Sequence, residues 1–200
     1  MTSRLKHAGL ILAAGASERM GSPKALLPAP GNIPLAQYQA GLLKHGGCAE
    51  VVVVLGADYE KIKDALRACD LVHNAFWERG RFSSAQVGLR ALRVFDGIFI
   101  LPVDTVGVSL ETVRVTFTFA DEKKPLAVRP TFHGENGKVA WVSRALAEEV
   151  TRMDTASRLN EVLESRALKL PVNDPAILSN VNTLEDWEEA RSRLSAISAP

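Results

Sequence analysis

Residues 10–27 read LILAAGASERMGSPKALL, and this stretch decides how the rest of the chain is interpreted. The apolar run 9–14 predicts a buried strand, and a small, polar segment follows it directly. Glycine permits a positive φ and leaves backbone N–H groups uncovered, while Arg supplies a forked donor and Lys a mobile point charge. Together these residues predict a strand that runs into a phosphate-holding loop. The residues that carry this chemistry are Gly15, Arg19, Gly21 and Lys24.

The spacing of this loop differs from two common phosphate motifs. A Walker A loop has four residues between its glycines and Lys directly after the second glycine. Here five residues separate Gly15 from Gly21, and two more precede Lys24. The dinucleotide-binding pattern G-x-G-x-x-G is not matched either. The spacing therefore disfavours an ordinary P-loop hydrolase or dehydrogenase.

Composition limits the class of protein. The chain has 200 residues, 46% hydrophobic and 24% charged, which suits one globular domain over 1–200. A net charge of +1 gives no basic field for nucleic acid or a membrane surface. The apolar runs are strand-sized and too short to cross a bilayer. The two cysteines, Cys48 and Cys69, lack a metal-type spacing, so we expect reduced thiols and a cytoplasmic location.

Strand-like and helix-like segments alternate along the chain. This order predicts an α/β protein with a three-layer α/β/α, Rossmann-like fold and a mostly parallel sheet. Ser83 and Ser84 are expected to cap a helix that runs to about 92, and Thr155 to cap the helix at 156–164. Thr183 is expected to cap the last helix, with Asp186 completing a capping box. We predict further strands over 50–55, 71–74, 97–103, 126–129, 138–142, 168–172 and 177–181, and helices over 34–44, 58–68, 109–120, 143–152, 156–164 and 184–194.

Polar residues follow three of the predicted strands. The Gly15 loop follows the first strand, Asp104 follows the strand at 97–103, and Asn180 and Asn182 lie at the end of the last predicted strand. In a parallel sheet the ligand crevice lies beyond the carboxyl ends of the strands. Carboxylate and amide oxygens are ligands that Mg²⁺ accepts, with substrate phosphates and water completing its shell. We therefore expect polyphosphate, metal and cations at one site.

Four segments together resemble a known family. Residues 12–27, LAAGASERMGSPKALL, resemble the signature LAxGxSxRMGxxKxLL of MobA-like nucleotidyltransferases. GRFSSAQVGLRAL at 80–92 is similar to the family's nucleotide-side segment, LPVDT at 101–105 to its metal-binding stretch, and NVNTLEDW at 180–187 to its closing motif. Ala14 stands where the molybdenum cofactor guanylyltransferases have Gly. The chain thus most resembles the molybdenum cofactor cytidylyltransferases.

The resemblance implies an activity and a set of site residues. Members transfer a nucleoside monophosphate from an NTP, here CTP, to a phosphorylated acceptor such as molybdopterin, with Mg²⁺ as cofactor and release of pyrophosphate. A molybdoenzyme is an implied contact partner. The implied catalytic residues are Arg19, Lys24 and Asp104, and the implied metal residues are Asp104 and Asn182. The implied nucleotide-binding residues are Leu12, Ala13, Ala14, Gly15, Ala16, Ser17, Arg19, Lys24, Ser83 and Ser84.

The chain departs from the family on the acceptor side. Lys138 and Val139 stand where related cytidylyltransferases often have His-Pro. Lys138 could meet an anionic acceptor or face solvent, and Arg81 could add a phosphate contact or lie on the surface. These departures leave the acceptor open.

Several alternatives also stay open. The base could be guanine, and the acceptor could be a sugar or polyol phosphate. The chain could also be a non-catalytic nucleotide-binding or carrier protein that kept the fold. Asn182, Ser83 and Ser84 could serve only as helix caps.

Overall fold

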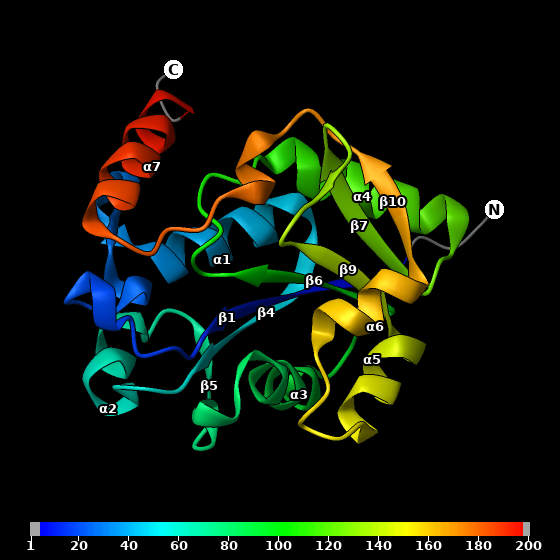
Figure 1. Ribbon diagram of the computed structural model, residues 1–200, viewed down its shortest axis with the longest axis horizontal. Helices are drawn as coiled ribbons and strands as arrows, with labels where there is room; N and C mark the ends of the chain where they lie inside the picture. The colour runs from blue at the N-terminus through cyan, green and yellow to red at the C-terminus, as the bar shows by residue number, and fades with distance from the viewer. Residues whose placement is uncertain (1–4, 198–200) are drawn as a thin grey trace.

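The computed structural model describes the backbone of residues 5–197 and the side chains of residues 5–194, and a mixed sheet lies at its centre (Figure 1). The described strands are ordered β10-β7-β9-β6-β1-β4-β5, with the short β8 paired to β7. The strand bounds are β1 His7–Ala13, β4 Cys48–Leu55, β5 Asp70–His73, β6 Gly97–Pro102, β7 Ala127–Phe132, β8 Glu135–Asn136, β9 Ala140–Ser143 and β10 Ala167–Pro171; β2 Pro28–Ala29 and β3 Ile33–Pro34 form a separate two-stranded ribbon.

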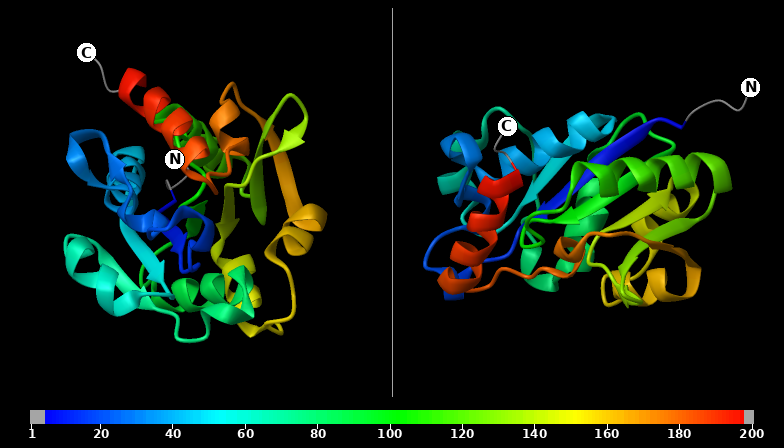
Figure 2. Two further views of the ribbon diagram at one scale, coloured as in Figure 1. Left: turned by 60° about the vertical axis from the view of Figure 1, so that its left-hand side comes forward. Right: turned by 90° about the horizontal axis from the view of Figure 1, so that it is seen from above.

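Helices cover both faces of the sheet, so the predicted three layers are confirmed. On one face α1 and α4 pack against each other (Figure 2), and α7 contributes Trp187 and Leu194 to the same core. On the other face α3, α5 and α6 bury a second core. The helix bounds are α1 Leu35–Gly46, α2 Tyr59–Ile62, α3 Arg81–Ala91, α4 Leu110–Lys123, α5 Arg144–Arg152, α6 Leu159–Arg166 and α7 Leu184–Ile197. No helix within 5–197 is long and apolar enough to cross a membrane.

β1 is the central strand, and its sequence explains why. All seven of its residues are buried, and it pairs in parallel with β4 on one side and β6 on the other. Leu10 and Leu12 enter the core beneath α3, whereas Ile11 enters the core beneath α1. A strand with apolar side chains on both faces is stable only in the middle of such a sandwich. The loop after β1 is thereby fixed at the carboxyl edge of the sheet.

The sheet is largely parallel, but β9 and the short β8 run in the opposite direction. β9 runs antiparallel to both β6 and β7. Only residues 133–139 separate β7 from β9, and β8 within them turns back on β7. A connection this short cannot make the crossover that a parallel pair requires.

Two predicted helix starts and one predicted helix need correction. Ser83 and Ser84 are not caps, because α3 begins at Arg81 and its N-cap is Gly80. The helix predicted from 156 begins at Leu159 with Arg158 as N-cap, so Thr155 does not cap it. The helix predicted over 58–68 divides into the short α2 and a 3₁₀ turn, Lys63–Leu66.

The strand predicted at 177–181 is also wrong. Residues 175–178 form a 3₁₀ helix that Asp174 caps by accepting from the Ala176 backbone N–H at 3.1 Å. The segment after it hydrogen-bonds to the loop that follows β6: Val181 N donates to the Asp104 backbone oxygen at 2.9 Å, and Val106 N donates to Ser179 Oγ at 2.8 Å. Ile177 is buried, which accounts for the apolar pattern without a strand. In contrast, the capping box of α7 is confirmed, because Asp186 N donates to Thr183 Oγ1 and Thr183 N donates to Asp186 Oδ2.

Candidate active site

The loop after β1 closes on itself and so fixes Lys24. Ser17 has a left-handed backbone with φ 55° and ψ 30°, and Gly21 has φ 65°. Ser17 Oγ accepts from the Lys24 backbone N–H at 3.1 Å, and the Met20 N–H donates to the Ser17 oxygen at 2.9 Å. A left-handed non-glycine residue is sparsely populated and persists where surrounding contacts hold it. Ser17 therefore has a structural role that the sequence pattern did not reveal.

The two glycines of the loop serve different purposes. Gly21 needs glycine because its φ is positive. Gly15 has an ordinary φ, and a Cβ placed there would meet nothing within 4 Å. Glycine at position 15 therefore keeps the mouth of the cleft open and its backbone accessible.

A cleft of about 170 Å³ lies between this loop, the start of α3 and the end of β6. It brings together most of the residues expected to bind the nucleotide, and also Arg81, for which the sequence permits either a phosphate contact or a surface position. Its lining residues are Leu12, Ala13, Ala14, Gly15, Ser17, Lys24, Arg81, Ser84, Pro102, Val103 and Asp104.

A second pocket of about 360 Å³ continues the site past Lys24, which lines both spaces. Arg19 is exposed and lies on this outer side with Trp77 and Asn182. Ala16 also lines this pocket and is absent from the lining of the first. The predicted loop residues therefore line two spaces, an inner cleft and an outer pocket that holds Arg19, Lys24 and the carboxylate of Glu18; Ser17 and Lys24 line both.

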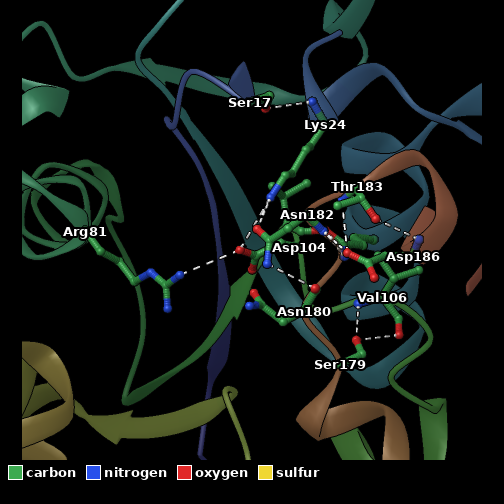
Figure 3. A network of polar contacts seen from close by, with 12 residues as sticks. Ser17, Lys24, Arg81, Asp104, Val106, Ser179, Asn180, Asn182, Thr183 and Asp186 are labelled. Carbon is green, nitrogen blue, oxygen red and sulfur yellow. Dashed lines mark hydrogen bonds and ion pairs between the residues drawn. The ribbon is translucent and has the colours of Figure 1, made fainter. Parts of the chain in front are cut away.

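Lys24 lies at the centre of the polar network of the site and contacts residues from three segments (Figure 3). Its Nζ donates to Asn182 Oδ1 at 2.8 Å and lies 3.9 Å from Asp104 Oδ2. Only 14% of the Lys24 side chain is exposed. Burial lowers the pKa of Lys24, and the neighbouring guanidiniums of Arg19 and Arg81 lower it further, against the opposing pull of Asp104. An ammonium held in this way is strongly stabilised by a bound anion.

Asp104 sits at the junction of three cations. Arg81 Nη2 lies 3.7 Å from Asp104 Oδ2. With its amide nitrogen turned toward Asp104, Asn180 donates to the same oxygen at 3.2 Å and accepts from Lys138 Nζ at 3.2 Å. Burial lowers the pKa of Lys138, and nearby Asp104 partly offsets this. Asn180 therefore links the ammonium of Lys138 to the Asp104 carboxylate.

The residues around Asp104 suit a divalent cation. Asp104 Oδ1 is buried and accepts no hydrogen bond from any described residue. Within 5–197 no group of three His, Cys, Asp or Glu side chains could hold a metal by itself. One free carboxylate oxygen at a cleft lined by Lys24 and Arg81 fits Mg²⁺, which keeps most of its shell as water and substrate phosphate. Asn182 Oδ1 is engaged by Lys24, so in this arrangement Asn182 positions the ammonium.

Ser83 and Ser84 are held by a residue that sequence reasoning missed. Asn74, just after β5, is 1% exposed and donates through Nδ2 to both serine hydroxyls at 3.0 Å. Ser84 lines the cleft, whereas Ser83 donates to the Gly80 oxygen at 2.8 Å. In the sequence, Asn74 is only a polar residue at the end of the strand predicted over 71–74. That position does not indicate which side chains Asn74 contacts.

A family model described as the MobA-like NTP transferase domain matches residues 9–170. The chain therefore belongs to the MobA-like NTP transferase family and is an enzyme of the nucleotidyltransferase class. The MobA-like nucleotidyltransferase family expected from the sequence is therefore confirmed, while the family model does not distinguish its cytidylyltransferases from its guanylyltransferases.

Two relatives match parts or most of the chain. Nicotine blue oxidoreductase of Paenarthrobacter nicotinovorans is 40% identical over 108 residues, 52% of each protein, so the match spans about half of either chain. A Mycobacterium avium (strain 104) protein named "Probable molybdenum cofactor guanylyltransferase" is 27% identical over 193 residues, 93% of this chain and 95% of its own. Neither name refers to a cytidylyltransferase.

Solved structures confirm the fold. A nucleotidyl transferase from Methanothermobacter has a TM-score of 0.81 at 22% identity, covering 96% of this chain and 99% of that one. Rv0371c of Mycobacterium tuberculosis H37Rv, in complex with manganese, has a TM-score of 0.73 at 20% identity, covering 94% and 98%. At such identities the likeness shows the α/β nucleotidyltransferase fold alone.

Proposed function

We propose that this protein transfers CMP from CTP to a phosphorylated acceptor, with molybdopterin as the leading acceptor and Mg²⁺ as cofactor. The observation that carries the proposal is the division of labour within the Asp104 carboxylate: Oδ1 is buried and accepts no hydrogen bond from a described residue, while Oδ2 lies 3.9 Å from Lys24 Nζ and 3.7 Å from Arg81 Nη2. A carboxylate with cations beside it suits a metal–polyphosphate complex, because the carboxylate can bind the metal ion and the cations can bind the phosphates. A single catalytic domain over 1–200, in the cytoplasm and able to contact a molybdoenzyme, is part of the same proposal.

Each loop residue has a role in this scheme. The backbone of 12–17 wraps the nucleoside and its α-phosphate, while Ser84, held by Asn74, lies at the nucleoside end of the cleft. Arg19, in the outer pocket, binds the β- and γ-phosphates. Lys24 bridges the two pockets and neutralises charge that develops at the α-phosphate. Asp104 would hold Mg²⁺, which when bound would neutralise phosphate charge; a fold relative was solved in complex with manganese.

The transfer needs no proton from the protein. A phosphate oxygen of the acceptor forms a bond to the α-phosphorus, while the bond from the α-phosphorus to the bridging oxygen of the β-phosphate breaks. Pyrophosphate leaves with that oxygen and its electron pair. The enzyme therefore contributes alignment and charge neutralisation rather than covalent chemistry.

Ala14 supports the choice of cytosine. Its side chain lines the cleft and is buried, and its backbone oxygen accepts from the Ala57 N–H at 3.0 Å, which fixes its position. A methyl group here narrows the base pocket compared with Gly, which favours a pyrimidine over the larger guanine.

The proposal is tested by measuring pyrophosphate release with each of the four NTPs, Mg²⁺ and molybdopterin. We expect CTP to support the fastest acceptor-dependent release. Faster release with GTP would show that the enzyme transfers GMP and not CMP. Turnover only with sugar or polyol phosphates would show that the acceptor is one of these and not molybdopterin. Tight Mg·NTP binding without release for every acceptor would favour the non-catalytic carrier.

A second candidate is oxidoreductase chemistry of the kind named for the nicotine blue relative. The 40% identity to that protein favours it. The absence of the G-x-G-x-x-G spacing from the sequence weighs against the usual nicotinamide dinucleotide site. Oxidation of NADH or NADPH, followed by absorbance in the presence of nicotine blue, distinguishes the two: dye-dependent oxidation without pyrophosphate release supports the second candidate.

A further inference from the structure

Another cavity, distinct from the inner cleft and the outer pocket, lies beside the inner cleft and shares the residue Arg81 with it. It measures about 570 Å³ and is lined by the start of α3 and by residues 155–161, which comprise the end of the α5–α6 connection and the first turn of α6. Arg81 is the shared residue, because it lines both spaces. Two spaces that meet at one cation are arranged for two ligands that approach each other there.

The lining of this cavity is polar and positively charged. Arg79 and Arg158 add two guanidiniums to that of Arg81, and Glu161 is the one carboxylate among the described lining residues. Phe82 and Leu159 supply a buried apolar floor. The cavity therefore suits a small molecule that carries negative charge at its rim and has a less polar body.

The three guanidiniums are available to a ligand. Half of the Arg81 side chain is exposed, and its ion pair with Asp104 is long at 3.7 Å. Arg158 is 80% exposed, and its Nε lies 3.8 Å from Glu161. The guanidinium of Arg79 rests on the ring of Phe76, 4.5 Å from the centroid. Weak, exposed ion pairs of this kind contribute little, so exchanging them for a bidentate phosphate contact is favourable.

The back wall of the cavity is tied to the segment that carries Lys138. Arg129 is 8% exposed and donates through Nε to the Gly137 oxygen at 2.9 Å. Its Nη2 donates to Asn160 Oδ1 at 3.4 Å. Burial lowers the pKa of Arg129. Arg129 therefore connects Asn160 in the wall of the cavity to Gly137, the residue before Lys138.

We propose that this cavity is the acceptor site, and that Arg81 binds the acceptor's attacking phosphate at the boundary with the nucleotide cleft. Arg79 and Arg158 bind a second anionic or strongly polar group of the same molecule, whose body lies over Phe82 and Leu159. The acceptor class is thus a phosphorylated small molecule with a further polar group. The inference rests on the proposed nucleotidyl transfer and adds where, and through which residues, the acceptor is held.

Steady-state kinetics with CTP and molybdopterin test the outer part of the site. Arg158→Ser removes a guanidinium that lies outside the nucleotide cleft. We expect the KM for molybdopterin to rise about tenfold, the equivalent of one charge-assisted hydrogen bond, while the KM for CTP stays within about twofold. The matched control is Arg93→Ser, an exposed arginine whose backbone N–H donates to Glu50 at the opposite edge of the sheet. An unchanged KM for molybdopterin in Arg158→Ser overturns the assignment.

A readout independent of turnover tests Arg81. Modification of arginines by phenylglyoxal is followed by mass spectrometry, with α,β-methylene-CTP and Mg²⁺ filling the nucleotide cleft. Millimolar inorganic phosphate should then slow modification of Arg81 and leave Arg93 unaffected. Equal modification of Arg81 with and without phosphate overturns the inference.

The two experiments separate this inference from the proposed function. Protection of Arg81 without any CMP transfer supports the phosphate subsite and contradicts the transfer. CMP transfer that is insensitive to Arg158→Ser, without protection of Arg81, supports the transfer and contradicts the acceptor site.

Discussion

At the scale of single residues, the charges of the candidate active site lie on a few side chains, above all Lys24, Arg81 and Asp104. These side chains already contact one another in the absence of a ligand. Lys24 is held at both ends, by Ser17 Oγ on its backbone and by Asn182 Oδ1 on its ammonium. Lys24 Nζ lies 3.9 Å from Asp104 Oδ2, which is too far for a hydrogen bond, so the ammonium can turn toward a bound anion without breaking one. Such preorganised charge acts without the cost of reorienting dipoles during the reaction.

Replacing Lys24 tests this role. We expect Lys24→Ala to lower kcat by about 10²-fold, as for loss of one preorganised electrostatic donor. Lys169→Ala, at an exposed position on β10, is the matched control. Pyrophosphate release measures both, and full activity of Lys24→Ala would remove Lys24 from the mechanism.

The lowered pKa of Lys24 predicts a pH profile. Burial makes the ammonium lose its proton at a lower pH than an ordinary lysine, whose pKa is 10.5. Because the protonated form binds phosphate, kcat/KM for CTP should fall as the pH rises through this lowered pKa. Lys24→Arg should move the fall to higher pH, since a guanidinium does not titrate in that range. The same alkaline fall in Lys24→Arg would assign the titration to another group.

At the scale of elements, sequence patterns were sufficient for most strands and helices but not for their contacts. β1, β4 and β6 were predictable because unbroken apolar runs have few alternatives inside an α/β sheet. The reversed β9 depends on the shortness of the 133–139 connection, which the turn-rich sequence indicated without giving a direction. The strand predicted at 177–181 is wrong because the burial of Ile177 gives the segment a strand-like apolar pattern. In the structure Val181 N instead donates to the backbone of the loop after β6.

Asn74 shows what an element end contributes to the site. It donates to Ser83 Oγ and Ser84 Oγ and accepts from the Phe76 N–H at 3.0 Å, so it joins β5 to α3. Asn74→Ala leaves these partners unsatisfied in a buried setting. We expect a loss of about 2 kcal/mol in the free energy of unfolding, measured by urea denaturation.

A matched variant gives this prediction its control. Asn173→Ala changes an exposed asparagine and should leave stability unchanged. The KM for CTP should also rise in Asn74→Ala, because Ser84 lines the cleft. Equal stability of the two variants would contradict the role of Asn74 in fixing α3.

At the scale of the whole molecule, the site joins segments from both ends of the chain. The loop after β1, Asp104 after β6 and the 180–183 segment before α7 meet in one network (Figure 3). The convergence of the loop after β1 with Asp104 was predictable, because β1 and β6 are parallel neighbours and their carboxyl ends lie at one edge. The 180–183 segment joins them through the hydrogen bond from Val181 N to the Asp104 backbone oxygen, not from the end of a strand as predicted. The positions of Lys138 and of the cavity at 155–161 were not predictable, because they depend on the irregular connections around β9 and α6.

This convergence predicts that a ligand stabilises the whole fold. Saturating Mg·CTP should raise Tm by about 5 °C, since binding to the native state alone adds about 2.7 kcal/mol at a hundred times Kd. Asp104→Asn should lose most of the Mg²⁺-dependent part of the shift. Scanning fluorimetry with and without Mg²⁺ measures this, and an equal shift in Asp104→Asn would remove the metal from that carboxylate.

Nucleotidyl transfer itself is tested most directly by the fate of labelled phosphates. The protein is incubated with Mg²⁺, molybdopterin and CTP radiolabelled at either the α- or the γ-phosphate, and the products are separated. The proposed transfer places the α label in the acceptor product and the γ label in pyrophosphate. Recovery of the γ label in the acceptor or in orthophosphate, or of neither label in any product, would contradict it.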